Sequence, residues 1–153
     1  MRKPFSLTDQ DALVLTKLPR YHWLSSQNVV FFGLRSVDWL VPAGFITDFA
    51  SIPVAVWGLY QPDEIEVAPA FLLHDFLYRT QNGITRRYAD WCLHEILRRR
   101  GLGRWPRLAI YWAVRLNSKK VWLSYSRQNV DIPAHRIDDE DILRINALKA
   151  IED

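Results

Sequence analysis

The chain has 153 residues, 49% of them hydrophobic, which is enough apolar surface for one domain with a full core. Its single cysteine, Cys92, excludes an internal disulfide and a zinc site built from cysteines. The formal net charge is a mild +3, no apolar run approaches the roughly 20 residues of a membrane span, and no basic and then apolar leader opens the sequence. We therefore expect a protein that is cytoplasmic when it is synthesised.

Short β-branched and aromatic runs, separated by turn residues, fill the first third of the chain. Pro19, Pro42 and Gly44 mark three of the turns. The close spacing of the runs predicts an antiparallel meander or a strongly bent sheet. The predicted strands are 12–18, 21–25, 28–35, 37–41 and 45–49.

After residue 50 the hydrophobic period changes to that of helices. Ser51 and Thr85 are predicted to cap two of them, and Gly83 and Gly101 are natural stops. The predicted helices are 51–57, 68–80, 85–100, 105–125 and 138–152.

These elements predict an α+β fold. N-terminal antiparallel strands, over about 12–50, pack against a C-terminal helical part with an antiparallel helix pair at about 68–80 and 85–100. We expect a single domain over 1–153, with strands in 1–50, a helical core in 51–125 and a C-terminal helix in 133–153.

Ionisable side chains interrupt the otherwise apolar helix predicted at 68–80. His74 and Tyr78 are four residues apart and share one stripe of the helix, with Asp75 about 100° around it. The short connection 81–83 returns the next helix antiparallel and can bring Asp90 opposite His74. A carboxylate there would hold the imidazole in one tautomer and stabilise its protonated form, as a general base requires.

His-Asp-x-x-Tyr on one helix, followed by Ala-Asp on its antiparallel partner, is similar to the active-site core of phospholipase A(2). Among these enzymes, the pattern most resembles the disulfide-free phospholipase A(2) found in parvovirus capsid proteins. The resemblance implies that His74 activates a water, that Asp75 is a calcium ligand, and that Asp90 and Tyr78 orient the imidazole. The matching residues are His74, Asp75, Tyr78, Ala89 and Asp90.

Phospholipases of this type also bind calcium through carbonyl groups of a glycine-rich loop ahead of the helix, and this chain has no such loop. The candidate replacement is the segment 42–53, with Gly44 as a hinge. The segment also offers Thr47, Asp48 and Ser51, and because calcium prefers about six to eight oxygen ligands, Asp48, Asp75 and backbone carbonyls could form the site. Asp48 could equally cap the helix at 51–57 or pair with an arginine.

Four motifs in order resemble an uncharacterised family, a domain of unknown function, found mainly in tailed phages and prophages. This resemblance implies synthesis in the cytoplasm of a bacterial host and an association with the virion, but no settled activity. The motifs cover roughly residues 38–117 and are VPAGFITDFASIP, LLHDFLYR, RRYADWCLHEIL and YWAVRL.

Basic and aromatic side chains alternate after residue 97. Such a face suits an anionic phospholipid membrane, and nucleic acid is the less favoured partner. A solvated arginine face over a tryptophan-rich core is the structural alternative. The residues concerned are Arg98, Arg99, Arg100, Arg104, Trp105, Arg107, Tyr111, Trp112, Arg115, Lys119, Lys120, Trp122 and Tyr125.

Three functions remain open at this point. The first is a phospholipase A(2)-like ester hydrolase that uses a water activated by His74, with calcium near Asp75. The second is a non-catalytic virion or tail-assembly protein that binds other virion proteins, in which the same side chains form a buried polar network. The third is a metal-dependent hydrolase that uses His74, Asp75, Asp90 and His94.

Solvent access separates the first two functions. A catalytic pair must open onto a cleft with room for an acyl chain. A structural network should instead be closed over by Phe45, Phe49, Trp57 and Phe71.

Overall fold

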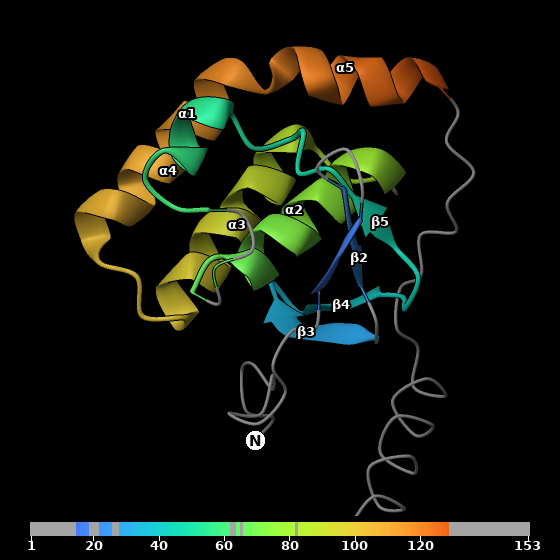
Figure 1. Ribbon diagram of the computed structural model, residues 1–153, viewed down its shortest axis with the longest axis horizontal. Coiled ribbons are helices and arrows are strands. Elements are labelled where there is room, and N and C mark those ends of the chain that lie inside the picture. Colours follow the sequence, from blue (N-terminus) through green and yellow to red (C-terminus); the bar gives the residue numbers. More distant parts are fainter. Residues whose placement is uncertain are drawn as a thin grey trace, which may run out of the picture.

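The computed structural model describes residues 15–18, 22–25, 28–61, 64, 66–81 and 83–128 (Figure 1). Within this part of the chain, strands come first and packed helices follow, which confirms the α+β class. The helix predicted at 138–152 lies outside the described residues. None of the described helices combines the length and the apolar character that a membrane crossing requires.

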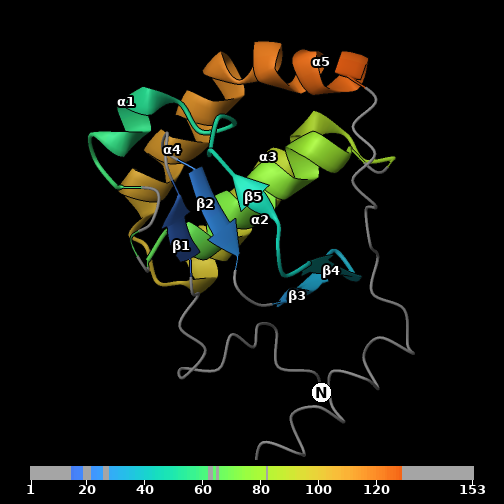
Figure 2. The same ribbon diagram turned by 45° about the vertical axis from the view of Figure 1, so that its right-hand side comes forward.

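The strands form two separate antiparallel sheets rather than one meander or bent sheet. In the first sheet, β2 (His22–Ser25) lies between β1 (Leu15–Leu18) and β5 (Ile46–Thr47). In the second, β3 (Val29–Leu34) pairs with β4 (Val37–Val41). The chain thus leaves the first sheet after β2, builds a hairpin, and returns beside β2 (Figure 2).

Strand β5 is only two residues long, whereas the sequence predicts a strand over 45–49. Side chains divert the backbone here, because Thr47 Oγ1 accepts from Phe49 N at 3.0 Å and Asp48 Oδ1 accepts from Ala50 N at 2.9 Å. Phe49 takes a left-handed φ of 52°. The segment after β5 is therefore a loop, and it presents Ser51 to the helices.

Helices α2 (Ala68–Thr80) and α3 (Arg86–Arg99) follow the prediction closely. Thr85 caps α3 as predicted, with its hydroxyl accepting from Tyr88 N at 3.1 Å. Helix α2 ends at Thr80 as predicted and Gly83 is left-handed as predicted, with a φ of 69°, but Gln81 directly after the helix is also left-handed, with a φ of 46°.

The single helix predicted at 105–125 is two helices, α4 (Arg104–Asn117) and α5 (Lys119–Gln128). They separate at Ser118, whose φ and ψ of −97° and 8° leave the helical region and whose hydroxyl donates to the Ser51 carbonyl at 2.6 Å. Helix α1 (Val54–Trp57) starts later than predicted. Ser51 does not cap it, because the Ser51 hydroxyl bonds to another helix.

Helix α2 is the central element of the core. Every residue from Ala68 to Tyr78 is buried, because α3, α5 and the strands β4 and β5 all contact α2. Figures 1 and 2 both show the β3–β4 hairpin and α5 at opposite ends of the molecule, with α2 and α3 between them. Polar side chains on α2 are therefore enclosed by protein.

Hydrogen bonds fix the β3–β4 hairpin on α3. Trp39 Nε1 donates to the Tyr88 hydroxyl at 3.0 Å, and that hydroxyl donates to the Leu34 carbonyl at 2.8 Å. Arg99, near the end of α3, donates to the Phe32 carbonyl at 2.6 Å. The hairpin is thus hydrogen-bonded to α3 near both ends of the helix.

Leucine-to-alanine changes test this packing. Leu73 is 0% exposed on α2, and Leu116 is 76% exposed on α4. We expect Leu73→Ala to lower the free energy of unfolding by about 2–5 kcal/mol, because it leaves a cavity in the core. Leu116→Ala should change it by less than about 0.5 kcal/mol. Urea denaturation measures both, and similar losses in the two variants would contradict the packing.

Candidate functional site

The helix pair sets the imidazole of His74 against the carboxylate of Asp90, as predicted. His74 Nε2 lies 2.8 Å from Asp90 Oδ1, and both side chains are 0% exposed. The Tyr78 hydroxyl donates to the same oxygen at 2.7 Å, and its ring centroid lies 4.2 Å from that of His74. In the neutral imidazole, the carboxylate acceptor places the ring proton on Nε2 and leaves Nδ1 as an acceptor.

Arginines from two helices face the other oxygen of Asp90. Arg115 Nη1 lies 2.6 Å from Oδ2, and Arg86 Nη1 lies 3.8 Å from it. Burial raises the pKa of Asp90, but hydrogen bonds from His74, Tyr78 and Arg115 outweigh burial and hold the pKa below its ordinary value. Asp90 is therefore an anion at neutral pH, and it joins α2, α3 and α4.

The second ring nitrogen of His74, Nδ1, faces the side chain of Ser51. The sequence predicts Ser51 only as a helix cap and as part of the segment 42–53, not as a partner of His74. Ser51 Oγ lies 3.0 Å from His74 Nδ1, and Ser51 is 0% exposed. In this neutral tautomer, the Ser51 hydroxyl donates to Nδ1. Ser51, His74 and Asp90 thus form two hydrogen bonds in series, which we call the relay. The sequence signal that could have identified Ser51 as a site residue is its place in the motif VPAGFITDFASIP.

Asp75, the predicted calcium ligand, contacts a different set of groups. Its Oδ2 accepts from Thr47 Oγ1 at 2.6 Å and lies 3.2 Å from Arg79 Nε. Its Oδ1 is buried without a hydrogen-bond partner. Burial raises the pKa of Asp75 more than the Arg79 charge and the Thr47 hydrogen bond lower it.

Arg79 lies among the oxygen atoms that a calcium ion would use. Besides its contact with Asp75, it donates to Asp48 Oδ1 at 2.8 Å and to the Ile46 carbonyl at 3.1 Å. The guanidinium supplies a positive charge at this place, and a divalent cation beside it would be repelled. The unpartnered Oδ1 of Asp75 adds only one oxygen toward the six to eight or so that calcium prefers. With Arg79 in position, these residues do not fit calcium.

His94 lies apart from the relay. Arg107 Nε donates to His94 Nε2 at 3.1 Å, and the His94 ring packs edge-on against Tyr111. Within the described ranges, no group of three or more His, Cys, Asp or Glu side chains could hold a metal ion. The structure thus does not bring together the third set, His74, Asp75, Asp90 and His94.

Several of the arginines contact protein groups at the surface of the fold. Arg98 and Arg99 both contact Glu95, and the hydrogen bond from Arg98 contributes most to lowering the pKa of Glu95 to about 2. Arg107 also donates to the Leu102 carbonyl at 3.0 Å. These three arginines therefore already contact protein groups, while the Arg98 side chain stays 55% exposed.

The relay is closed to solvent in this structure. Ser51, His74 and Asp90 are each 0% exposed. Of the side chains expected to cover a structural network, Phe45, Phe49 and Phe71 are buried and Trp57 is partly buried. A substrate could reach the relay only if part of this cover moved.

A family model described as a protein of unknown function, DUF1353, matches residues 23–114. The matched segment contains Ser51, His74 and Asp90. No curated protein and no solved structure matches the chain.

The buried charge of Asp90 predicts a pH-dependent effect of Asp90→Asn. The folded pKa is lowered, so the stability that the carboxylate contributes is present above its ordinary pKa and is lost as the pH falls through the folded value. We expect Asp90→Asn to lower the free energy of unfolding by about 3 kcal/mol at pH 7, because His74, Tyr78 and Arg115 then lack the buried anion that they contact. The loss should shrink as the pH is lowered from about 5 to about 2.

Urea denaturation over that pH range measures the effect of Asp90→Asn. Glu64→Gln, at an exposed position, is the matched control and should leave the profile unchanged. A loss that is independent of pH would contradict the assignment of Asp90 as a buried anion.

Proposed function

We propose that this chain, which belongs to the DUF1353 family of proteins of unknown function, is an ester hydrolase with His74 as its general base. The relay is the observation that carries the proposal. Nδ1 of His74 contacts a hydroxyl group at 3.0 Å, and Nε2 contacts a buried carboxylate at 2.8 Å. A general base needs both: a proton source on one side and an orienting anion on the other.

In the proposed reaction, His74 takes a proton from the attacking oxygen through Nδ1 and becomes positively charged. Asp90 stabilises this charge at Nε2, while Tyr78 holds the carboxylate in place. Arg115 partly neutralises Asp90. The Asp90 carboxylate therefore stabilises the imidazolium less than a carboxylate without an arginine partner would. His74 then returns the proton to the leaving alcohol.

The proposed reaction has no step that uses calcium. Arg79 lies between Asp75 and Asp48, where the resemblance to phospholipase A(2) expects the ion. The guanidinium supplies the positive charge that balances these two carboxylates. Hydrolysis is therefore expected to proceed in the presence of a chelator.

Phospholipid is the proposed source of the ester, because α4 presents an apolar stripe to solvent. The outer α4 stripe consists of Trp105, Trp112 and Leu116, which are 77%, 57% and 76% exposed and share one helix face. Solvated apolar side chains at such spacing are typical of a surface that contacts a partner or a membrane.

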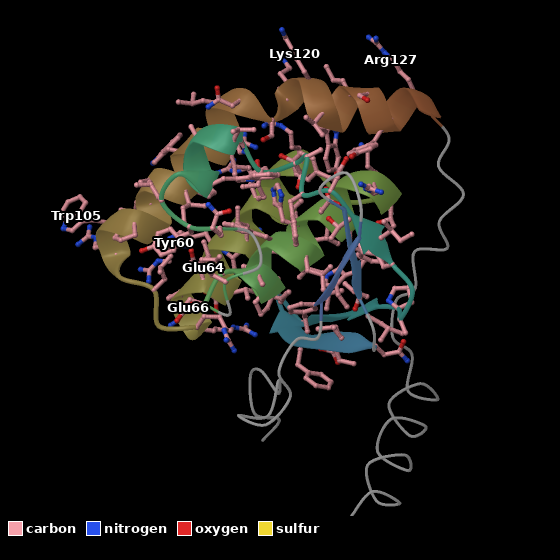
Figure 3. The ribbon with its side chains drawn as sticks, viewed as in Figure 1. Tyr60, Glu64, Glu66, Trp105, Lys120 and Arg127 are labelled. Atoms are coloured by element: carbon pink, nitrogen blue, oxygen red, sulfur yellow. The ribbon has the colours of Figure 1, made fainter. Side chains whose placement is uncertain are left out.

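The charges around the outer α4 stripe favour an anionic bilayer as the partner. Every charged side chain from residue 96 to residue 128 is Arg or Lys. The Arg104 guanidinium lies 5.6 Å from the Trp105 ring centroid. Figure 3 shows Trp105 pointing outward from α4, and Lys120 and Arg127 pointing outward from α5. Exposed tryptophan beside basic side chains suits the headgroup region of such a bilayer.

The second candidate function is structural, and the closure of the relay favours it. All three relay side chains are 0% exposed, and each is hydrogen-bonded to the next. A satisfied polar network of this kind can fix how helices pack without any chemistry. In that case the chain acts as an assembly component, for which the sequence expects virion or tail proteins as partners.

Fatty-acid release from vesicles separates the two candidates. We expect the wild type to release fatty acid from anionic phospholipid vesicles with or without a chelator, and His74→Ala to lower the rate at least about 10²-fold. His94→Ala, on α3 but outside the relay, is the matched control and should keep the rate. Circular dichroism checks that both variants fold.

The structural candidate predicts the opposite pattern. The wild type would then release no fatty acid from any vesicle, and His74→Ala would lower the melting temperature by several degrees, because Asp90 and Ser51 lose a buried partner.

The outer α4 stripe predicts membrane binding. We expect the double change Trp112→Ser and Leu116→Ser to lower the fraction of protein that sediments with anionic vesicles at least fivefold, because the apolar contact is lost. Ile46→Ser is the matched control, since Ile46 is 44% exposed but lies on β5. Equal sedimentation of wild type and both variants would exclude this surface.

A further inference from the structure

We propose that Ser51, rather than a water, is the nucleophile of this hydrolase and carries the acyl group on Oγ during turnover. The inference rests on the proposed function, and it replaces the water that the resemblance to phospholipase A(2) implies. Ser51 stands next to the base in the structure, on a loop that neither helix of the predicted pair contains.

The hydrogen bonds of His74 carry the inference. An imidazole has two ring nitrogens, and each has one in-plane direction for a hydrogen bond. Nε2 is directed at Asp90 at 2.8 Å, and Nδ1 is directed at Ser51 Oγ at 3.0 Å. A water can bond to Nδ1 only if Ser51 leaves it. In the observed arrangement, the proton that His74 can accept is that of the Ser51 hydroxyl.

The loop that carries Ser51 is fixed from both sides. Before Ser51, the Thr47 side chain holds the backbone of Phe49, which has a left-handed φ of 52° and is buried. After it, the Ser118 hydroxyl donates to the Ser51 carbonyl at 2.6 Å. A bulky residue in the left-handed region is strained, and such strain gathers where a fold must hold a group in one place. The loop thus presents Oγ to Nδ1 in a fixed orientation.

The covalent reaction balances with water as the only co-reactant. Ser51 Oγ attacks the ester carbonyl carbon and gives its proton to His74 Nδ1. The carbon–oxygen bond to the alcohol then breaks, and the alcohol leaves with the proton from Nδ1, so that an acyl ester remains on Ser51. In the second half, His74 deprotonates a water that attacks the acyl ester, and Ser51 regains the proton as the carboxylic acid leaves.

Covalent labelling in the presence of anionic phospholipid vesicles tests the inference. The probe is an alkyl fluorophosphonate, which phosphonylates an activated serine with loss of fluoride. We expect mass spectrometry of the digested protein to find the adduct on Ser51 in the wild type and in Ser126→Ala, whose serine is exposed on α5. His74→Gln should lose the adduct, because the base that activates the hydroxyl is gone.

Hydrolysis by Ser51 variants separates this inference from the proposed function. Ser51→Ala should lower fatty-acid release at least about 10³-fold while Ser126→Ala keeps it. If Ser51→Ala does not fold, Ser51→Cys takes its place and should form a thioester adduct that hydroxylamine cleaves. Release that survives Ser51→Ala, or a wild type that hydrolyses lipid without any adduct on Ser51, overturns the serine mechanism and leaves a water mechanism standing. A wild type with neither release nor adduct overturns the proposed function itself.

Discussion

A carboxylate that is shielded from water needs donors on every side, and this requirement organises the helical half of the molecule. Asp90 lies on α3, and its donors come from two other helices: His74 and Tyr78 from α2, and Arg115 from α4. Leaving a buried charge unpaired costs several kcal/mol, so a packing of the three helices that misplaced any donor would be strongly disfavoured. The geometry of the relay and the arrangement of the helices therefore depend on one another.

The helix pair and the contact between His74 and Asp90 could be predicted because local rules set them. Helical spacing places His74 and Tyr78 on one stripe, and the short connection after α2 fixes the direction of α3. The partners of this pair could not be predicted in the same way. Ser51 is 23 residues from His74, and Arg115 is 25 residues from Asp90, so both contacts depend on the tertiary fold. Ser51 is a good helix cap by its local sequence, but its hydroxyl is used elsewhere.

The failed predictions have the same origin. Regular spacing of β runs says nothing about which strands pair, and β5 returns to β2 across the hairpin. The apolar period continues through 105–125, yet a tertiary hydrogen bond at Ser118 divides that segment into two helices. The sequence pattern also does not determine whether the relay is exposed to solvent. The hydrogen bonds of the relay fit the proposed hydrolase, whereas its closure to solvent fits a structural network.

The hydrogen bond from Ser118 to the Ser51 carbonyl also links two parts of the chain that are far apart in sequence. It joins the corner between α4 and α5 to the peptide group of the residue that touches the imidazole. A motion that pulls this corner outward must first break it, at a net cost of about 1 kcal/mol, which corresponds to roughly a fivefold difference in population. A displacement of the corner between α4 and α5 is thus coupled to the loop of Ser51 by one hydrogen bond between two buried residues.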